Sequence, residues 1–292
     1  MSIAAARAPT SAGVYFFLGA HSELLYVGKA AHLHTRLAQH AHAKPGAGRR
    51  LAVLYQRVAD VRWEVLPDEE AAATREADVI VALRPPFNAS IAGDGRWNYV
   101  VVEPEGDGLR FDLTGDAVVT TSGRAHGCFP HLGRGVSSRP AIACSDGYTA
   151  LLRLLWATSC GRRDHVPTRI TRAAPDTFTT PVPTDLRPPL HAFLSGTTDR
   201  LLAGLGSTAA PHLAPALGRD RTAAAAFFRH GPRALRRLRL RHREPRGPWS
   251  RARIEAVLAA ELREAIGDFT LPPPLDERDE ILGRRAHRWA RS

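Results

Sequence analysis

The stretch GVYFFLGAHSELLYVGK, residues 13–29, decides the fold of this chain. Two apolar runs, at residues 13–18 and 24–27, flank a short polar segment, which is the pattern of a β-hairpin. Each run carries one tyrosine, Tyr15 in the first and Tyr26 in the second. The sequence therefore predicts two paired strands that each present a tyrosine.

Lysine is rare in this chain, which makes Lys29 at the end of the stretch unusual. Lys29 and Lys44 are the only lysines, against 38 arginines. An ammonium group can lose its proton at an accessible pKa, whereas a guanidinium group stays charged. Lys29 is therefore a candidate for a chemical role that arginine would not fill.

The overall charge points to a polyanionic partner. The chain has 292 residues, of which 44% are hydrophobic, and a formal net charge of +11. Nucleic acid is the first candidate partner and an acidic membrane surface the second, while a basic surface that meets only solvent is the third interpretation. No run reaches the about 18 apolar residues that span a bilayer, so no membrane partner is expected.

The cysteines and the first residues indicate a cytoplasmic location. The three cysteines are Cys128, Cys144 and Cys160, an odd number with wide spacing, which fits a reducing cytosol rather than a disulfide framework. The first twenty residues contain no charged segment followed by an apolar core of the kind that a signal peptide has.

Composition divides the chain into four predicted segments. Residues 10–95 hold the hairpin, a further strand near residues 61–66 and three helical stretches, which predict a small α/β domain with a three-stranded antiparallel sheet flanked by helices. Residues 96–165 predict a small β-rich and helical extension. The proline-rich residues 166–190 predict a linker or an extended segment, and residues 191–292 predict a mainly α-helical basic C-terminal region of unknown role.

The first predicted helix follows Lys29 and covers residues 30–43. Lys29, Arg36 and His40 are spaced by 7 and 4 residues, which places them within roughly 40° of one another on a helix surface. One face would thus carry two cationic donors and an imidazole. A polar face that only contacts solvent remains the alternative.

The last helix of this domain, at residues 67–83, carries a carboxylate in its apolar stripe. Glu76 has apolar neighbours one and two turns away: Ala72, Ala73, Val79, Ile80 and Leu83. The polar residues are expected on the solvent side: Asp68, Glu69, Arg75 and Asp78. A carboxylate that points inward needs a cation or hydrogen-bond donors. Glu76 is therefore either half of a buried ion pair with Arg36 or a ligand for Mg²⁺.

Two further features carry candidate residues. Asn88 ends the segment 84–88, where two prolines would hold its amide in place, and a plain turn asparagine is the alternative. Residues 219–243 contain nine arginines and one acid, Asp220, which suggests a surface that tracks phosphates, with a membrane-surface helix as the weaker alternative. The candidate DNA-binding residues are Arg233, Arg236, Arg237, Arg239, Arg241 and Arg243.

Five separated elements resemble one known family in their order and spacing. They are Gly13-Val14-Tyr15, Tyr26-Val27-Gly28-Lys29, Arg36, Glu76 and Asn88 after its two prolines. Together they are similar to the GIY-YIG nuclease domain, in the form found at the N-terminus of bacterial excinuclease C and its short single-nuclease homologues. The resemblance covers about residues 10–100, and a weaker likeness to excinuclease C continues to residue 161.

The sequence departs from this family at two places. His40 stands where many members carry a tyrosine. Some excinuclease C proteins hold an iron–sulfur cluster on a group of cysteines, but only Cys160 lies near the corresponding place, so no iron–sulfur cluster is expected.

The resemblance implies hydrolysis of a phosphodiester with one divalent metal, Mg²⁺ or Mn²⁺. Glu76 would hold the metal and Arg36 would grip the phosphate. Tyr26 would take the proton of the attacking water while Tyr15 orients it, or the reverse. Lys29 would favour the phenolate form of the tyrosine that acts as the base, or would pass on the proton. Supporting roles would fall to three residues: Gly28, His40 and Asn88.

The function implied is a Mg²⁺-dependent DNA endonuclease of nucleotide-excision-type repair. Its partners would be DNA and damage-recognition or helicase-like repair proteins. One alternative is a GIY-YIG endonuclease of restriction, recombination or a mobile element. The other is a non-catalytic nucleic-acid-binding protein with a degenerate nuclease core.

Overall fold

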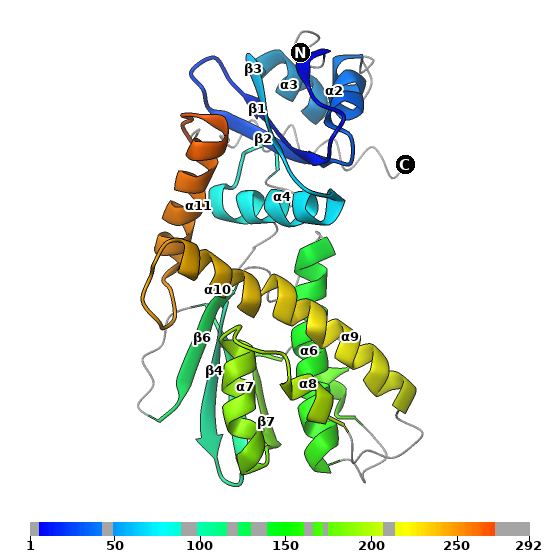
Figure 1. The fold of residues 1–292 in the computed structure, drawn as a ribbon, viewed down its shortest axis with the longest axis vertical. Coiled ribbons are helices and arrows are strands. Elements are labelled where there is room, and N and C mark those ends of the chain that lie inside the picture. Colours follow the sequence, from blue (N-terminus) through cyan, green and yellow to red (C-terminus); the bar gives the residue numbers. More distant parts are fainter. Residues whose placement is uncertain are drawn as a thin grey trace. The chain divides into compact units, whose positions relative to one another are not determined.

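The computed structural model describes residues 6–42, 49–88, 98–115, 122–129, 139–160, 166–171, 175–206 and 214–271. Its chain forms two compact units (Figure 1). Residues 1–93 and 255–292 make the first unit, and residues 94–254 make the second. Each unit is described by itself.

The first unit is built on a three-stranded antiparallel sheet of order β2-β1-β3. The strands are β1 (Gly13–Leu18), β2 (Leu24–Ala30) and β3 (Asp60–Val65). The pairing of β1 with β2 confirms the predicted hairpin, and the sheet confirms the predicted fold of this domain. Within the register, Tyr15 lies opposite Gly28, and Phe17 lies opposite Tyr26.

Helices cover both faces of this sheet. They are α2 (Leu33–Ala41), α3 (Arg49–Arg57) and α4 (Glu69–Leu83). Figure 1 shows α2 and α3 on one side of the strands and α4 on the other. Asp68 caps α4 by accepting a hydrogen bond of 2.7 Å from the amide of Ala71. The helix ends at Arg84, in a left-handed conformation with φ of 46°.

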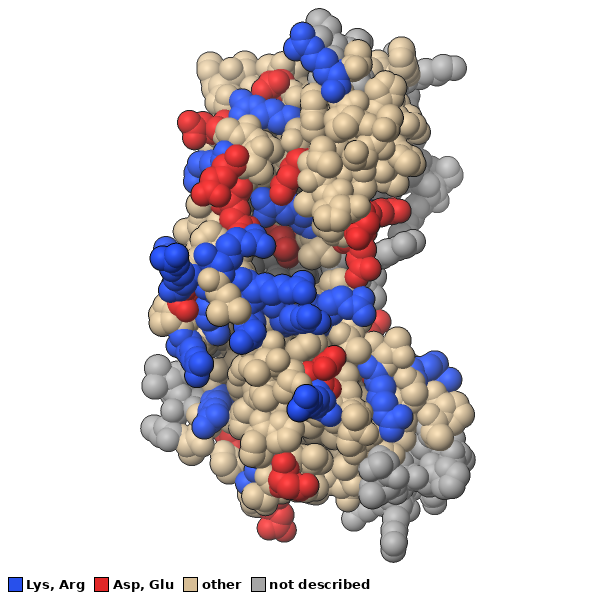
Figure 2. Space-filling model, viewed as in Figure 1, with Lys and Arg blue, Asp and Glu red and all other residues tan. Residues whose placement is uncertain are grey.

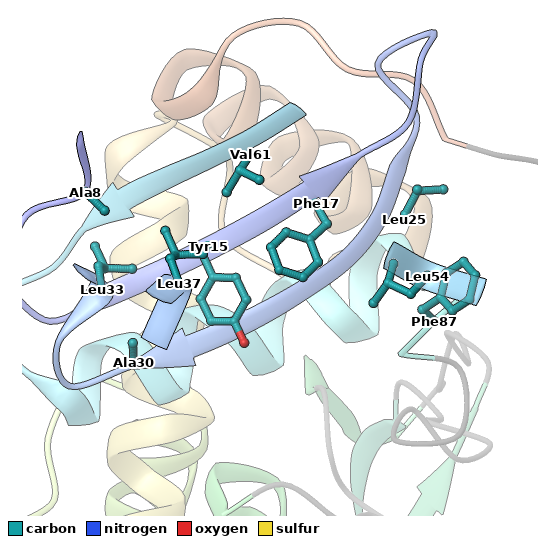
Figure 3. Close-up of a cluster of buried hydrophobic side chains, with 10 residues drawn as sticks. All are labelled: Ala8, Tyr15, Phe17, Leu25, Ala30, Leu33, Leu37, Leu54, Val61 and Phe87. Atoms are coloured by element: carbon teal, nitrogen blue, oxygen red, sulfur yellow. The ribbon is translucent and has the colours of Figure 1, made fainter. Parts of the chain in front are cut away.

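The apolar core of the first unit follows the alternation of the strands. Figure 3 shows Tyr15 and Phe17 of β1 in one cluster with side chains of the two helices on that side, among them Leu33, Leu37 and Leu54. The alternate residues of β1 are also fully buried: Val14, Phe16 and Leu18. Because both faces are covered, β1 reads as a continuous apolar run in the sequence.

A segment from the far end of the chain completes the first unit. Helix α11 (Arg251–Ile266) begins after the N-cap Ser250, whose hydroxyl accepts a bond of 3.2 Å from the amide of Arg253. Residues 255–271 belong to the first unit, so the predicted region 191–292 does not stay together. The correction has a physical basis, because Arg62 donates hydrogen bonds of 2.9 Å and 2.8 Å to backbone carbonyls of residues 266 and 268.

The same segment corrects the prediction for two polar residues of α4. The periodicity places Arg75 on the solvent side, but its side chain is only 12% exposed and pairs with Glu64 at 2.9 Å and Glu261 at 3.5 Å. Burial raises the pKa of Asp78 to about 7, although nearby Arg75 opposes this rise. Helix α11 covers the face of α4 that the periodicity alone assigns to water.

The second unit contains a four-stranded antiparallel sheet of order β6-β4-β5-β7. The strands are β4 (Asn98–Glu105), β5 (Gly108–Thr114), β6 (Arg124–Phe129) and β7 (Thr177–Pro181). Strand β7 lies in the segment 166–190, so residues 177–181 form an extended segment, as one predicted alternative has it, and the linker alternative is wrong for them. Phe178 and Thr180 alternate inward and β7 pairs as an edge strand, where a terminal proline is tolerated.

Helices pack against one another in this unit. They are α6 (Arg139–Cys160), α7 (Arg187–Leu194), α8 (Leu201–Gly204), α9 (Ala214–His230) and α10 (Pro232–Arg241), with single turns η1 (Thr168–Ile170) and η2 (Thr184–Leu186). Helices α6 and α9 touch closely, because a Cβ on Gly147 would lie 2.2 Å from the carbonyl oxygen of Ala223. Arg153 of α6 also pairs with Asp220 of α9. No helix within the described ranges is long and apolar enough to cross a membrane.

We expect Arg75→Ala to lower the free energy of unfolding of the first unit by about 2 kcal/mol, because it leaves two partly buried carboxylates without their cation. Urea unfolding followed by circular dichroism measures this change. Arg7→Ala, which removes an exposed arginine of the same unit, is the matched control and should be neutral. Equal stability of the two variants would contradict the structural role of Arg75.

Candidate active site

One pocket of the first unit, of about 450 Å³, gathers every side chain that the sequence predicts to be catalytic. These five residues come from β1, β2, α2 and α4: Tyr15, Tyr26, Lys29, Arg36 and Glu76. The predicted common helix face is corrected in one respect, because Lys29 lies in β2 and α2 begins only at Leu33. The pocket thus forms where the end of β2, the start of α2 and one face of α4 meet.

The hairpin register fixes the ring of Tyr15 across its neighbouring strand. A Cβ on Gly28 would lie 2.4 Å from both the Cζ and the hydroxyl oxygen of Tyr15. Any side chain at position 28 would therefore displace the phenol, which explains the glycine. The ring centroids of Tyr15 and Tyr26 lie 6.1 Å apart, and both side chains line the same pocket.

The hydroxyl of Tyr15 belongs to a short chain of hydrogen bonds. It lies 2.8 Å from Nε2 of His40, and Nδ1 of the same imidazole lies 2.7 Å from the hydroxyl of Tyr55 on α3. The predicted supporting residue His40 therefore contacts Tyr15 rather than the pocket itself. The sequence analysis did not single out Tyr55. Its position next to the core residue Leu54 on α3 is the signal that could have indicated a partly buried hydroxyl.

Burial keeps the side chains of Tyr15, Tyr26 and His40 neutral. The pKa of His40 falls to about 4 because the imidazole is buried and the charge of Arg36 lies nearby. Burial also raises the pKa of Tyr15 and of Tyr26 above the ordinary phenol value. The nearby charge of Arg36 works against that rise in both tyrosines. Phenolate formation in this pocket therefore depends on positive charge.

The ammonium of Lys29 is directed elsewhere. Its Nζ lies 2.9 Å from Oε1 of Glu69, in an ion pair that is partly open to solvent. The expected effect of Lys29 on the phenol pKa is thus not found in the structure, where Arg36 is the cation that acts on both tyrosines. The backbone of Lys29 matters instead, as it contacts Glu76.

Glu76 is held by the edge of the sheet. Its Oε1 accepts a hydrogen bond of 3.0 Å from the amide of Lys29, and burial raises the pKa of its carboxyl. Among the described residues no ion pair joins Glu76 to Arg36, whose guanidinium donates to Oε1 of Gln39 at 3.2 Å. The interpretation of Glu76 as half of a buried ion pair with Arg36 is therefore wrong.

The donor set fits a magnesium ion. The half-buried carboxylate of Glu76, which has no cationic side-chain partner among the described residues, faces a pocket with room for an ion, its waters and a phosphate. No group of three or more metal-ligating side chains occurs in the part of the chain that the structure describes. Mg²⁺ suits this arrangement, because it keeps several waters and needs only one or two protein carboxylates.

Asn88 is a structural clamp on the edge strand β2. Its Oδ1 accepts from the amide of Val27 at 2.8 Å, and its Nδ2 donates to the carbonyl of Val27 at 2.9 Å. The amide of Phe87 also donates to the carbonyl of Leu25 at 3.1 Å. Asn88 is fully buried and does not line the pocket, so it holds the strand between Tyr26 and Gly28 in place.

Comparison with known proteins finds a match for the part of the chain that forms this pocket. Residues 11–89 match the sequence model described as the UvrC-like GIY-YIG domain. These residues form a UvrC-like GIY-YIG domain.

Relatives of known name match the same part of the chain. UvrABC system protein C of Synechocystis sp. is 33% identical over 94 residues, which are 32% of this chain and 15% of that protein. The same protein of Pseudomonas aeruginosa is 34% identical over 121 residues, which are 41% of this chain and 20% of that protein. The chain thus spans at most about a fifth of these relatives.

A solved structure is also similar to this part of the chain. It is the GIY-YIG N-terminal endonuclease domain of UvrC from Thermotoga maritima, bound to its catalytic magnesium. It is 25% identical and covers 30% of this chain and 93% of that one, with a TM-score of 0.27.

The predicted DNA-binding arginines lie outside the GIY-YIG domain, on and just after α10. Five of them are exposed: Arg233, Arg236, Arg237, Arg241 and Arg243. Figure 2 shows basic side chains gathered over this part of the chain. Arg239 differs, because helical spacing places it on the same face as the buried Pro232 and Leu235. Its guanidinium lies 5.6 Å from the ring centroid of Trp249 and is half buried.

We expect His40 to make the GIY-YIG domain less stable in mild acid. The unfolded imidazole takes up a proton near its ordinary pKa of about 6.5, whereas the folded one resists protonation down to a pKa of about 4. The contribution of His40 to stability is therefore complete above about pH 6.5 and is lost as the pH falls toward 4. His40→Tyr, which removes this titration, should unfold with a weaker dependence on pH.

Urea unfolding of both proteins at about pH 7 and pH 5 measures the difference. His34→Gln, at an exposed position of the same helix, is the control and should keep the dependence of the wild type. An identical pH dependence for wild type and His40→Tyr would show that the folded imidazole is not held neutral.

Proposed function

We propose that the GIY-YIG domain is a Mg²⁺-dependent endonuclease that hydrolyses a phosphodiester bond of DNA. The observation that carries the proposal is the convergence of two phenols, a guanidinium and a half-buried carboxylate on one pocket. The resemblance of residues 11–89 to the UvrC-like GIY-YIG domain supports the same activity.

Each side chain has a role that its position supports. The planar fork of Arg36, which lines the pocket, would grip the scissile phosphate through paired hydrogen bonds. Glu76 would hold the metal, which when bound would neutralise the charge that develops on the phosphate and the leaving oxygen. The amide of Lys29 fixes one oxygen of Glu76, which leaves the other to face the pocket.

The tyrosines would manage the attacking water. Tyr26, the less buried of the two, would take the proton from the water. Tyr15 would orient the water, since its hydroxyl is held at 2.8 Å from His40. In the reverse assignment, with Tyr15 as the base, the hydrogen-bond chain from Tyr15 through His40 would carry the proton toward the half-exposed Tyr55. The reverse assignment of the two tyrosines is distinguished by comparing Tyr15→Phe with Tyr26→Phe.

We further propose a role in nucleotide-excision-type repair, with damage-recognition proteins as partners. This rests on the named relatives, which are components of the UvrABC system. Cleavage of plain duplex, flap, bubble and adduct-bearing DNA by the full chain separates the pathways. Preference for the adduct or the bubble supports repair, and preference for a short sequence in plain duplex would instead support restriction.

We expect Glu76→Gln to lower the cleavage rate by ~10²–10³-fold, because it removes the charge that holds the metal. Cleavage of end-labelled DNA in Mg²⁺, with EDTA as the blank, measures the rate. Glu70→Gln changes an exposed carboxylate of the same helix and should keep the wild-type rate. More than a tenth of the activity left in Glu76→Gln would overturn the metal role, and binding without cleavage by the wild type would favour a degenerate core.

The arginines of α10 are proposed to bind the DNA backbone. Arg233 and Arg237 are both exposed on the outer face of the helix. Their joint replacement by alanine should reduce the slope of log affinity against log salt by about 1.8, since each lost phosphate contact on duplex DNA accounts for about 0.9. Fluorescence anisotropy in EDTA measures the slope. The double variant Arg169→Ala with Arg200→Ala, exposed elsewhere in the same unit, is the control. An unchanged slope in the α10 variant would end the proposal.

A further inference from the structure

The second unit contains a pocket of its own, of about 330 Å³. Its walls come from β6, the end of α7, the inner flank of α10 and the segment 247–248. Three of the lining residues are arginines, Arg124, Arg236 and Arg239, and none is acidic. A concave site with this composition favours an anion.

The positive charge of this pocket is not neutralised within it. Glu244 is the acid whose charge reaches Arg239, but that carboxylate is already paired with Arg253. The guanidinium of Arg239 is held in place by the ring of Trp249 and by a hydrogen bond to the carbonyl of Gly247. Its Nε is buried and has no hydrogen-bond partner among the residues that the structure describes. A donor is therefore left over in the wall of the pocket.

A second set of polar groups lies on β6 and just after α7. Nε2 of His126 lies 2.9 Å from Nδ1 of His191, and Nδ1 of His126 lies 3.4 Å from the hydroxyl of Ser195. His126 is 7% exposed, and burial lowers its pKa to about 3, so the imidazole is neutral. In the tautomer whose Nδ1 carries the hydrogen, the hydroxyl of Ser195 is free to donate its own hydrogen into the pocket.

The pocket is continuous with the outer face of α10. Residues advance about 100° per position around a helix, so Arg236 stands between the pocket flank and the outer face. Arg236 lines the pocket and is also exposed, and it adjoins Arg233 and Arg237 on the helix surface. An anion in the pocket would therefore be one charge in a row along this helix, which is the arrangement of phosphates along a nucleic-acid strand.

We propose that this pocket binds one phosphate group of a DNA strand whose neighbouring phosphates follow the outer face of α10. Arg124 and Arg236 hold the phosphate from two sides, with Ser195 as a neutral donor. The choice of DNA as the source of the phosphate rests on the proposed function, whereas the anion pocket stands without it.

The test is a double-mutant cycle on binding of fluorescein-labelled duplex DNA by the full chain in EDTA. If Arg124 and Arg236 hold the same phosphate, Arg124→Ala and Arg236→Ala are non-additive, and the double variant binds better than the product of the two single losses predicts. The double variant also lowers the salt slope by about 0.9, the value for one phosphate. Arg124→Ala combined with Arg233→Ala, which would touch different phosphates, is the matched control and should be additive.

Two further variants separate binding from folding. Arg124→Lys keeps the charge and should keep the salt slope, while Ser195→Ala should weaken binding several-fold without changing the slope, because a hydroxyl releases no counterion. Additive losses from Arg124→Ala and Arg236→Ala with an unchanged slope would overturn the proposal. So would a slope change of about 1.8 in that double variant, which would assign the arginines to two phosphates.

The source of the phosphate is distinguished by the DNA itself. Duplexes with a 5′-hydroxyl and a 5′-phosphate should bind equally if the pocket takes an internal diester. A preference for the 5′-phosphate that disappears in the double variant would assign the pocket to a strand end and still support a phosphate site. Because binding is measured without metal, a failure of cleavage in the Glu76 experiment leaves this result unaffected.

Discussion

The antiparallel register of β1 with β2 is the constraint on which the rest of the candidate site depends. It places Tyr15 opposite Gly28, where the absence of a side chain lets the phenol cross the strand. A slip of one residue would turn every side chain of β2 to the other face of the sheet. The side-chain carboxamide of Asn88 holds the edge strand in this register, because it accepts from the backbone amide of Val27 and donates to its carbonyl. The clamp therefore acts on the residue between Tyr26 and Gly28.

Burial then decides which groups of the pocket are charged. Tyr15, Tyr26 and His40 are neutral because burial penalises their charged forms. The positive charge of Arg36 further opposes protonation of His40. Arg36 remains cationic, and Glu76 is a carboxylate whose raised pKa records the cost of burial. A bound divalent cation would remove that cost and would add to the field that favours phenolate. The chemistry proposed for the pocket thus follows from the half-buried carboxylate of Glu76, whose charge burial penalises.

Segments from the two ends of the sequence meet in the first unit, and this contact has consequences for α4. The amide of Leu24 donates to the carbonyl of Thr270 at 2.9 Å, and the amide of Thr270 donates to the carbonyl of Ser22 at 3.0 Å. Together with the pairing of Arg75 and Glu261, these bonds hold residues 255–271 beside the sheet and α4. The helix that supplies Glu76 is therefore supported from its other face by a segment far away in sequence.

The sequence by itself determined the hairpin, because strand alternation is a local property, and its resemblance to the GIY-YIG family marked the five candidate catalytic residues that lie in the pocket. It also indicated that Glu76 points inward. Only the tertiary structure decided the roles of residues whose partners lie far along the chain. Tyr55 is hydrogen-bonded to His40, Lys29 forms an ion pair with Glu69, and Arg75 is buried against α11, where it pairs with Glu261. Residues 177–181, within the proline-rich segment, form a strand because they pair with the edge of β5. Periodicity gives the face on which a residue lies, but the element that covers that face is set by long-range packing, which no local pattern encodes.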